Sequence, residues 1–255
     1  MTVVTQEIIA DGLTRMGLPP GSIVLVHSSL SSFGHVEGGA NTVIDALLKV
    51  VGENGTIVVP TLTGDERNSP ENPPVFDPVN TSCWTGRIPE TFRQCPAAIR
   101  SVHPTHSVAA IGPAADELTA EHILSISPCD ELSPYGKIAR RANGYILFLG
   151  VDHEVNTTFH HVEELVGVDY HMQGEFAKAT LIMGDERIER HYMLHRWDTA
   201  RNFNIMDSIL LERGIQRITR IGNAEIRLIA ARRMVQVTAQ CLKANPRFLV
   251  ERDIP

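Results

Sequence analysis

The fold is decided by the stretch Gly144-Tyr145-Ile146-Leu147-Phe148-Leu149-Gly150 and the polar run that follows it, Val151-Asp152-His153-Glu154-Val155-Asn156-Thr157-Thr158-Phe159-His160. Tyr145 to Leu149 is a short apolar run between two glycines, which is typical of a strand covered by protein on both faces. Asn156, Thr157 or Thr158 can cap a helix that begins near Phe159. The stretch therefore predicts a buried strand that leads through a polar loop into a helix.

The predicted helix carries ionisable side chains in its first turns. His160, Glu163 and Glu164 are spaced i, i+3 and i+4, so they share one face of the helix. The positive end of the helix dipole disfavours a protonated imidazole, and a carboxylate one turn further along can orient the ring. This pattern fits a general base with a supporting carboxylate, but it fits equally a polar helix start in which His and Glu only stabilise the helix.

A second unit of the same kind precedes this stretch. The strand 22–26, the helix 40–51 and the strand 56–59 follow one another as strand, helix, strand. That order is typical of a parallel sheet with helices packed on it. We therefore predict an α/β fold with a mostly parallel central sheet flanked by helices.

The predicted strands end in polar or proline-bearing loops at His27, Pro60 and Gly150. In open parallel sheets, ligands bind beyond the carboxyl ends of the strands, so these loops should surround one crevice. The serines at 28, 29, 31 and 32, with the backbone amides after His27, would form a donor-rich cradle for an anionic or amide-bearing ligand. The alternative is that Ser28 only caps the next helix. Neither the P-loop nor the dinucleotide-binding glycine signature is present.

The remaining segments predict one domain, residues 1–255. The segment from about 62 to 84 contains Pro70, Pro73, Pro74 and Pro78, and a loop this long predicts a flap over the substrate. Further along, strands are expected at 108–111, 179–183 and 188–193, the last two forming a hairpin around Gly184. Helices are expected at 207–213 and 227–243.

Composition restricts the class of protein. The formal charge of −7 argues against a nucleic-acid binder and suits a cationic small-molecule substrate. No secretory signal and no long apolar span is apparent, which predicts a cytoplasmic protein without membrane partners. The four cysteines have no metal-ligand spacing, so we expect reduced thiols and no bound metal.

Several short motifs then match one family in order and approximate spacing. They are His27-Ser28-Ser29-Leu30, Gly38-Gly39-Ala40, Asp45-Ala46-Leu47-Leu48, Gly55-Thr56, Pro60-Thr61, Gly86 with Pro89-Glu90, His103-Pro104 with Ser107, Gly112-Pro113, Ser133-Pro134, and Gly150-Val151 with Asn156-Thr157-Thr158, His160 and Glu163. The chain resembles the aminoglycoside 3-N-acetyltransferases from about residue 23 to about 166. The family typically has Ser where this chain has Thr158, and similarity is weaker around Gly222 to Leu228.

The resemblance implies the family's own α/β fold, distinct from the common N-acetyltransferase fold, and acetyl-CoA as co-substrate. It implies that His160 is the general base and Glu163 its supporting carboxylate, with Glu225 as another candidate for that support. Coenzyme A would be held by the loop His27, Ser28, Ser29, Leu30, Ser31, Ser32 and Phe33, together with Ser107. The predicted substrate-binding residues are Asp65, Asn156, Thr157 and Glu164. The resemblance is also compatible with a homodimer.

The implied reaction is direct acetyl transfer to the 3-amino group of an aminoglycoside, which confers resistance. The alternatives are acyl transfer to another amine, a metal-dependent hydrolase that uses the many loop histidines, a covalent enzyme with Cys83 as nucleophile, and a binding protein without catalysis. The hydrolase lacks an H-E-x-x-H motif or comparable ligand spacing. Departures from the family pattern lie mainly in the segment 62–84. They therefore put the identity of the substrate in doubt and not the type of reaction.

Overall fold

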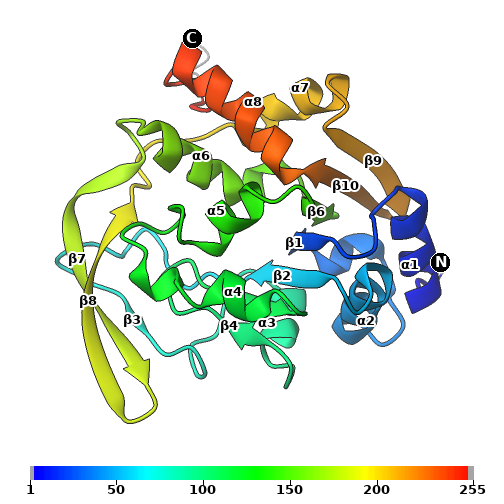
Figure 1. Cartoon of the computed structure of the whole chain (residues 1–255), viewed down its shortest axis with the longest axis horizontal. Helices are drawn as coiled ribbons and strands as arrows, with labels where there is room; N and C mark the ends of the chain where they lie inside the picture. The colour runs from blue at the N-terminus through cyan, green and yellow to red at the C-terminus, as the bar shows by residue number, and fades with distance from the viewer. Residues whose placement is uncertain (1–2, 252–255) are drawn as a thin grey trace.

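Three parallel strands form the centre of the molecule (Figure 1). The computed structural model describes residues 3–251, and its central strands are β1 (Ile23–Ser28), β2 (Thr56–Pro60) and β6 (Gly144–Leu149). β1 lies between the other two and pairs in parallel with both. Because all three strands run in the same direction, their carboxyl ends meet at one edge of the sheet, as the sequence predicted.

Antiparallel strands extend the sheet on both sides. β5 (Val108–Ile111) pairs with β2 and β4 (Ile99–Arg100) pairs with β5, while β10 (Ala224–Ala230) pairs with β6 and β9 (Gln216–Ile221) pairs with β10. The seven-stranded order is therefore β4-β5-β2-β1-β6-β10-β9. The predicted α/β fold is confirmed, and within this sheet parallel pairing is confined to the three central strands.

The two faces of the sheet bury separate hydrophobic cores because successive strand residues point to opposite sides. Val24 and Val26 pack with α1 (Gln6–Arg15), α2 (Ala40–Val51) and α3 (Arg87–Arg93). Ile23 and Leu25 face the other core, which includes α4 (Ala115–Thr119), α5 (Pro134–Ala139), α6 (Thr158–Val166), α7 (Met206–Glu212) and α8 (Ala231–Ala244). A strand buried on both faces explains the uninterrupted apolar runs in the sequence.

A small second sheet lies beside the first (Figure 1). Its strands are β3 (Val75–Phe76), β7 (Met172–Met183) and β8 (Glu186–His195), and β7 and β8 form a long antiparallel hairpin. The predicted hairpin is confirmed, although it is longer than the sequence indicated. At its open end Met172 pairs with His195, which places His171 and His195 side by side next to α6.

One predicted helix begins too early. Residues 227–230 belong to β10, and α8 begins only at Ala231. Ile226 and Leu228 alternate with Glu225 and Arg227, and pairing with β6 favours this strand over an additional helical turn. The single-domain boundary stays a prediction, and its ends, 1–2 and 252–255, lie outside the described residues. Between residues 3 and 251, no helix has both the length and the apolar character needed to span a membrane.

Candidate active site

The loops that follow β1, β2 and β6 surround a cavity of about 260 Å³. His27 and Ser28 line it from the end of β1, Pro60 from the end of β2, and Val151 from the loop after β6. His160 lines the same cavity from the first turn of α6. The predicted crevice at the carboxyl edge of the sheet is therefore present, with the predicted imidazole in its wall.

His160 is held by the carboxylate one turn further along its own helix. Its Nδ1 lies 2.8 Å from Oε2 of Glu163, as the i, i+3 spacing predicted. The Glu163 side chain is fully buried, whereas 23% of the His160 side chain is exposed. An Nδ1–H that donates to Glu163 leaves Nε2 as the ring's free lone pair, which is the arrangement a general base requires.

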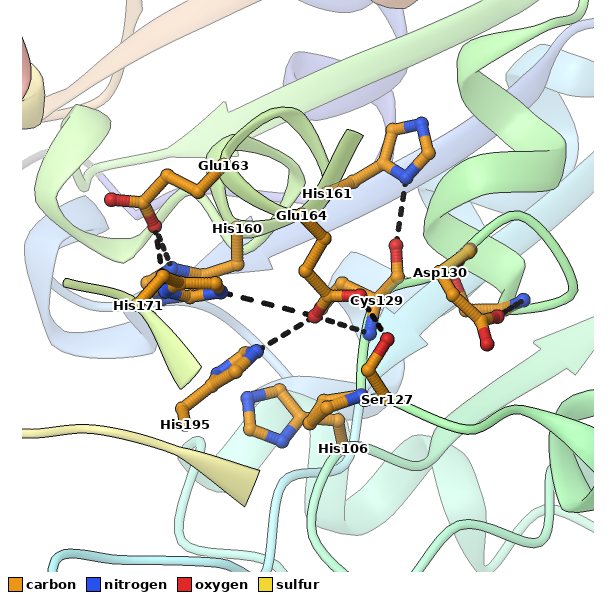
Figure 2. A network of polar contacts seen from close by, with 12 residues as sticks. His106, Ser127, Cys129, Asp130, His160, His161, Glu163, Glu164, His171 and His195 are labelled. Carbon is orange, nitrogen blue, oxygen red and sulfur yellow. Dashed lines mark hydrogen bonds and ion pairs between the residues drawn. The ribbon is translucent and has the colours of Figure 1, made fainter. Parts of the chain in front are cut away.

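Glu163 is itself surrounded by cationic or hydrogen-bonding groups (Figure 2). Its Oε2 lies 3.1 Å from Nδ1 of His171, and its Oε1 lies 3.4 Å from Nε of Arg201. Burial raises the pKa of Glu163, but the hydrogen bond with His160 and the charges of His160, His171 and Arg201 together lower that pKa to about 2. Glu163 is therefore an anion at neutral pH although it is buried.

Further imidazoles crowd around this pair. The ring centroids of His171 and His195 lie 5.0 and 4.8 Å from that of His160, and the centroid of His106 lies 4.5 Å from that of His195. Burial lowers the pKa of His171 to about 3 and the pKa of His106 and His195 well below the usual range. These three rings are accordingly neutral at physiological pH.

A groove of about 590 Å³ adjoins the cavity and shares Ser28 with it. Ser28, Ser29, Leu30 and Ser31 line this groove, and Gly86 and Arg87 line it from the start of α3. His27 lies in the wall of the cavity, where its Nε2 is buried and has no hydrogen-bond partner among the described residues. The predicted coenzyme-binding loop therefore borders both the groove and the cavity.

Three predicted coenzyme-binding side chains point elsewhere. Phe33 packs in the hydrophobic core, and the Ser32 hydroxyl donates to the carbonyl of Ser29. Ser107 is fully buried, and its hydroxyl donates to the carbonyl of Thr61 while Arg100 donates to it. The structure thus gives Ser107 protein partners, and its predicted role in coenzyme binding stays a prediction.

The predicted substrate-binding residues are dispersed. Thr157 lines the cavity, and Asp65 lines a small adjoining hollow while paired with Arg67. Asn156 is fully buried, and its Oδ1 accepts from the backbone N–H of Thr158 at the start of α6. Glu164 is buried as well, accepts from the Ser127 hydroxyl and the Cys129 backbone N–H, and contacts His195.

The alternative roles of Glu225 and Cys83 gain no support from their surroundings. Glu225 forms an ion pair with Arg227, 2.7 Å away, and it has no contact with His160. Burial raises the pKa of the Cys83 thiol, which disfavours the nucleophilic thiolate. Cys83 does not line the cavity.

Comparison with known proteins agrees with this geometry. The family model described as aminoglycoside 3-N-acetyltransferase matches residues 25–243. The chain belongs to the aminoglycoside 3-N-acetyltransferase family. Among its relatives, aminoglycoside N(3)-acetyltransferase VII of Streptomyces paromomycinus is 32% identical over 91% of this chain and 89% of the relative.

Solved structures of acetyltransferases share this fold. A mutant of aminoglycoside acetyltransferase AAC(3)-IVa in complex with a gentamicin superposes with a TM-score of 0.84 at 27% identity, covering 99% of this chain and 93% of the other. The binary complex of AAC-IIIb with CoASH superposes with a TM-score of 0.81 at 25% identity and covers both chains fully. The fold predicted from the family resemblance is confirmed.

Sequence reasoning missed five site residues of this acetyltransferase-family chain. Trp84 and Trp197, the only two tryptophans, line the cavity, while His171, His195 and Arg201 surround Glu163 and Glu164. The histidines lie at the open end of the hairpin and Arg201 lies in a later loop, so no local spacing connects them with His160. The one available signal was that both tryptophans fall in irregular polar segments.

Proposed function

We propose that this protein transfers the acetyl group of acetyl-CoA to an amine of an aminoglycoside, at the 3-amino group of the deoxystreptamine ring, by direct transfer with His160 as general base. The observation that carries the proposal is the pair formed by His160 and the fully buried Glu163 in the wall of a cavity at the carboxyl edge of the sheet. Acetylation of that amine removes a positive charge from the antibiotic, which would confer resistance.

The groove beside the cavity supports coenzyme A as the donor. Ser28, Ser29 and Ser31 line the groove, and Arg87 adds a cation suited to phosphate. The groove joins the cavity at Ser28, so an extended cofactor lying in it would direct its thioester towards His160. That AAC-IIIb was solved with CoASH bound supports coenzyme A as the ligand.

The cavity's other walls suit a cationic substrate. Glu154 lines the cavity and supplies a carboxylate for an ammonium group. Trp84 and Trp197 are 57% and 48% exposed, and their ring faces can attract ammonium groups through cation–π interactions. The complex of AAC(3)-IVa with a gentamicin supports an aminoglycoside as this substrate.

The reaction begins when the substrate ammonium loses a proton, because only the neutral amine has a lone pair that can attack. Nε2 of His160 accepts that proton, and Glu163 holds the ring through Nδ1. The amine nitrogen forms a bond to the acetyl carbon, and the carbonyl oxygen becomes an oxyanion that N–H donors stabilise. The carbon–sulfur bond then breaks, coenzyme A leaves as the thiolate, and the nitrogen loses its second proton to this thiolate or to solvent, which gives the neutral amide.

A thiol-release assay tests this function. The purified protein is mixed with acetyl-CoA and a panel of aminoglycosides, and simple amines serve as alternative acceptors. We expect release that depends on an aminoglycoside, with NMR of the product locating the acetyl group on the 3-amino nitrogen. Release with a different class of amine only would assign the related acyltransferase activity instead, and release with neither would contradict the proposal.

A further inference from the structure

Three imidazoles converge where His160 meets the hairpin (Figure 2). His160 on α6, His171 before β7 and His195 at the end of β8 each offer one ring nitrogen, and these nitrogens lie within 4.8 Å of one another. His171 and His195 are buried, and His160 borders the cavity. Three histidines with one open side toward a cavity match the ligand number of open zinc sites.

A carboxyl group contacts one nitrogen of each of these rings. Glu163 Oε2 lies 2.8 Å from Nδ1 of His160 and 3.1 Å from Nδ1 of His171. Oε1 of Glu164 lies 2.9 Å from Nε2 of His195. Metal-binding histidines commonly donate their second N–H to a carboxylate, which fixes the tautomer and turns the other nitrogen's lone pair towards the metal.

The nitrogens left for a metal lack other partners. Nε2 of His171 is buried without a hydrogen bond, and within residues 3–251 no hydrogen bond is formed by Nε2 of His160 or Nδ1 of His195. Nε2 of His171 lies 3.8 Å from Oε1 of Glu164, too far for a hydrogen bond. A buried nitrogen without a partner is costly, and coordination of a cation would satisfy it.

The three ring nitrogens need to move only a short distance to bind one zinc ion. Zinc–nitrogen bonds are about 2.0 to 2.1 Å, so nitrogens bound to one tetrahedral zinc ion lie about 3.4 Å apart. Nitrogens that are no more than 4.8 Å apart therefore lie close to this geometry. Nη2 of Arg201 donates to Nδ1 of His171 at 3.1 Å, so binding of a metal through Nε2 moves the ring proton to Nδ1, where Glu163 accepts it, and breaks the hydrogen bond from Arg201.

We propose that His160, His171 and His195 form a binding site for a zinc-like divalent transition metal, and that an ion bound there blocks acetyl transfer. Imidazole ligands favour such ions, and the anionic Glu163 offsets part of their charge. The inhibition rests on the proposed function, because the metal takes the Nε2 lone pair that His160 needs as a base. The ligand spacing of 11 and 24 residues matches no common zinc motif, so the sequence predicted no metal.

Metal binding is measured first, without substrates. Chelator-treated protein is titrated with Co²⁺, whose visible absorption reports coordination, and with Zn²⁺ in a calorimeter. We expect one ion per chain and a competition between the two metals. His171→Asn and His195→Asn should each weaken binding at least about tenfold, and Glu163→Gln should weaken it about 10- to 100-fold, as the loss of an outer carboxylate commonly does.

His191→Asn is the matched control, since His191 lies on the same strand as His195 but is exposed. It should bind the metal as the wild type does. Circular dichroism checks that the variants fold. Should the buried-site variants fail to fold, spectra of ¹⁵N-labelled histidines in the wild type with and without Zn²⁺ replace them, and three imidazoles should respond.

Inhibition is measured separately, in the acetyl-transfer assay. Zn²⁺ should inhibit at the concentration that half-saturates the site, and a chelator should restore turnover. Absence of saturable binding, or unchanged binding in folded His171→Asn and His195→Asn, would overturn the proposed site. Saturation without inhibition of an active enzyme would overturn the proposed block. If no acetyl transfer is found at all, the proposed function fails, while the titration still decides whether the site exists.

Discussion

At the scale of single residues, the site depends on how Glu163 positions His160. Glu163 contacts His160 and His171 through one oxygen and Arg201 through the other. The contact with Nδ1 of His160 leaves its Nε2 as the nitrogen that can accept a proton. A neutral amide in this position could hydrogen-bond to the ring but could not stabilise the imidazolium that forms when the base accepts a proton.

We therefore expect Glu163→Gln to lower kcat by about 10²- to 10³-fold, at the lower end of general acid–base contributions. The KM for acetyl-CoA should change little, because Glu163 does not line the proposed coenzyme groove. Steady-state kinetics with circular dichroism measure this. Glu175→Gln is the control, since Glu175 is an exposed carboxylate on β7. Equal effects of the two substitutions would contradict the role of Glu163.

Sequence spacing could predict part of this site. The i, i+3 relation of His160 and Glu163 follows from helix geometry alone, and the structure confirms their contact. His171 and His195 could not be predicted because their proximity depends on the register of a hairpin and on how it packs against α6. Asn156 and Glu164 share the polar character of ligand residues, but their side chains bind neighbouring protein groups.

At the scale of elements, the turn after β6 packs closely against the predicted coenzyme loop. Gly150 has φ of 69°, and its amide donates to the carbonyl of Glu225. A Cβ at this position would lie 1.6 Å from Oγ of Ser32. Only glycine satisfies both the left-handed backbone and the close approach of the two loops.

We expect Gly150→Ala to destabilise the protein by more than the roughly 1 to 2 kcal/mol that left-handed backbone alone costs a residue with a Cβ. Gly167→Ala separates the two effects, because Gly167 has φ of 73° at the end of α6 and no atom within 4 Å of an added Cβ. Urea unfolding of both variants measures the difference. Equal losses of stability would show that the contact with Ser32 is unimportant.

The order of elements was predictable where strands and helices alternate locally, and less so elsewhere. The strands 22–26, 56–59 and 145–149 follow from apolar runs bounded by turns, and all three lie in the sheet. Residues 227–230 of β10 resemble the start of a helix in the sequence. The alternating pattern of β10 is only seven residues long, and it continues directly into α8. The antiparallel edges of the sheet depend on contacts between distant segments, which periodicity does not encode.

At the scale of the whole molecule, the buried histidines make stability depend on pH. Burial lowers the pKa of His27 and His171 to about 3 and that of His122 to about 4, from an ordinary value of 6.5. Below pH 6.5 the unfolded chain therefore binds more protons than the folded protein, so stability falls as the pH falls. Burial raises the pKa of Glu164 to about 8, which acts in the opposite direction between pH 4.5 and 8.

Each of these three histidines lowers the free energy of unfolding by up to about 1.4 kcal/mol per pH unit below pH 6.5. The opposite effect of Glu164 cancels the contribution of about one histidine. His106 and His195 act in the same direction, so we expect the free energy of unfolding to fall by at least about 2 to 3 kcal/mol per unit between pH 6 and pH 5. Urea unfolding at constant ionic strength measures it. A flat profile over this range would contradict the neutral, buried state of these rings.

Acetyl transfer by this molecule depends, in our proposal, on one imidazole between the coenzyme groove and the substrate cavity. The most direct test compares His160→Ala with the wild type in acetyl-CoA-dependent acetylation of an aminoglycoside, with calorimetric titration of coenzyme A on both proteins. We predict that kcat falls by about 10²- to 10⁴-fold while coenzyme A binding is retained. A folded His160→Ala protein with near-wild-type turnover would contradict the proposed role of His160 as the base.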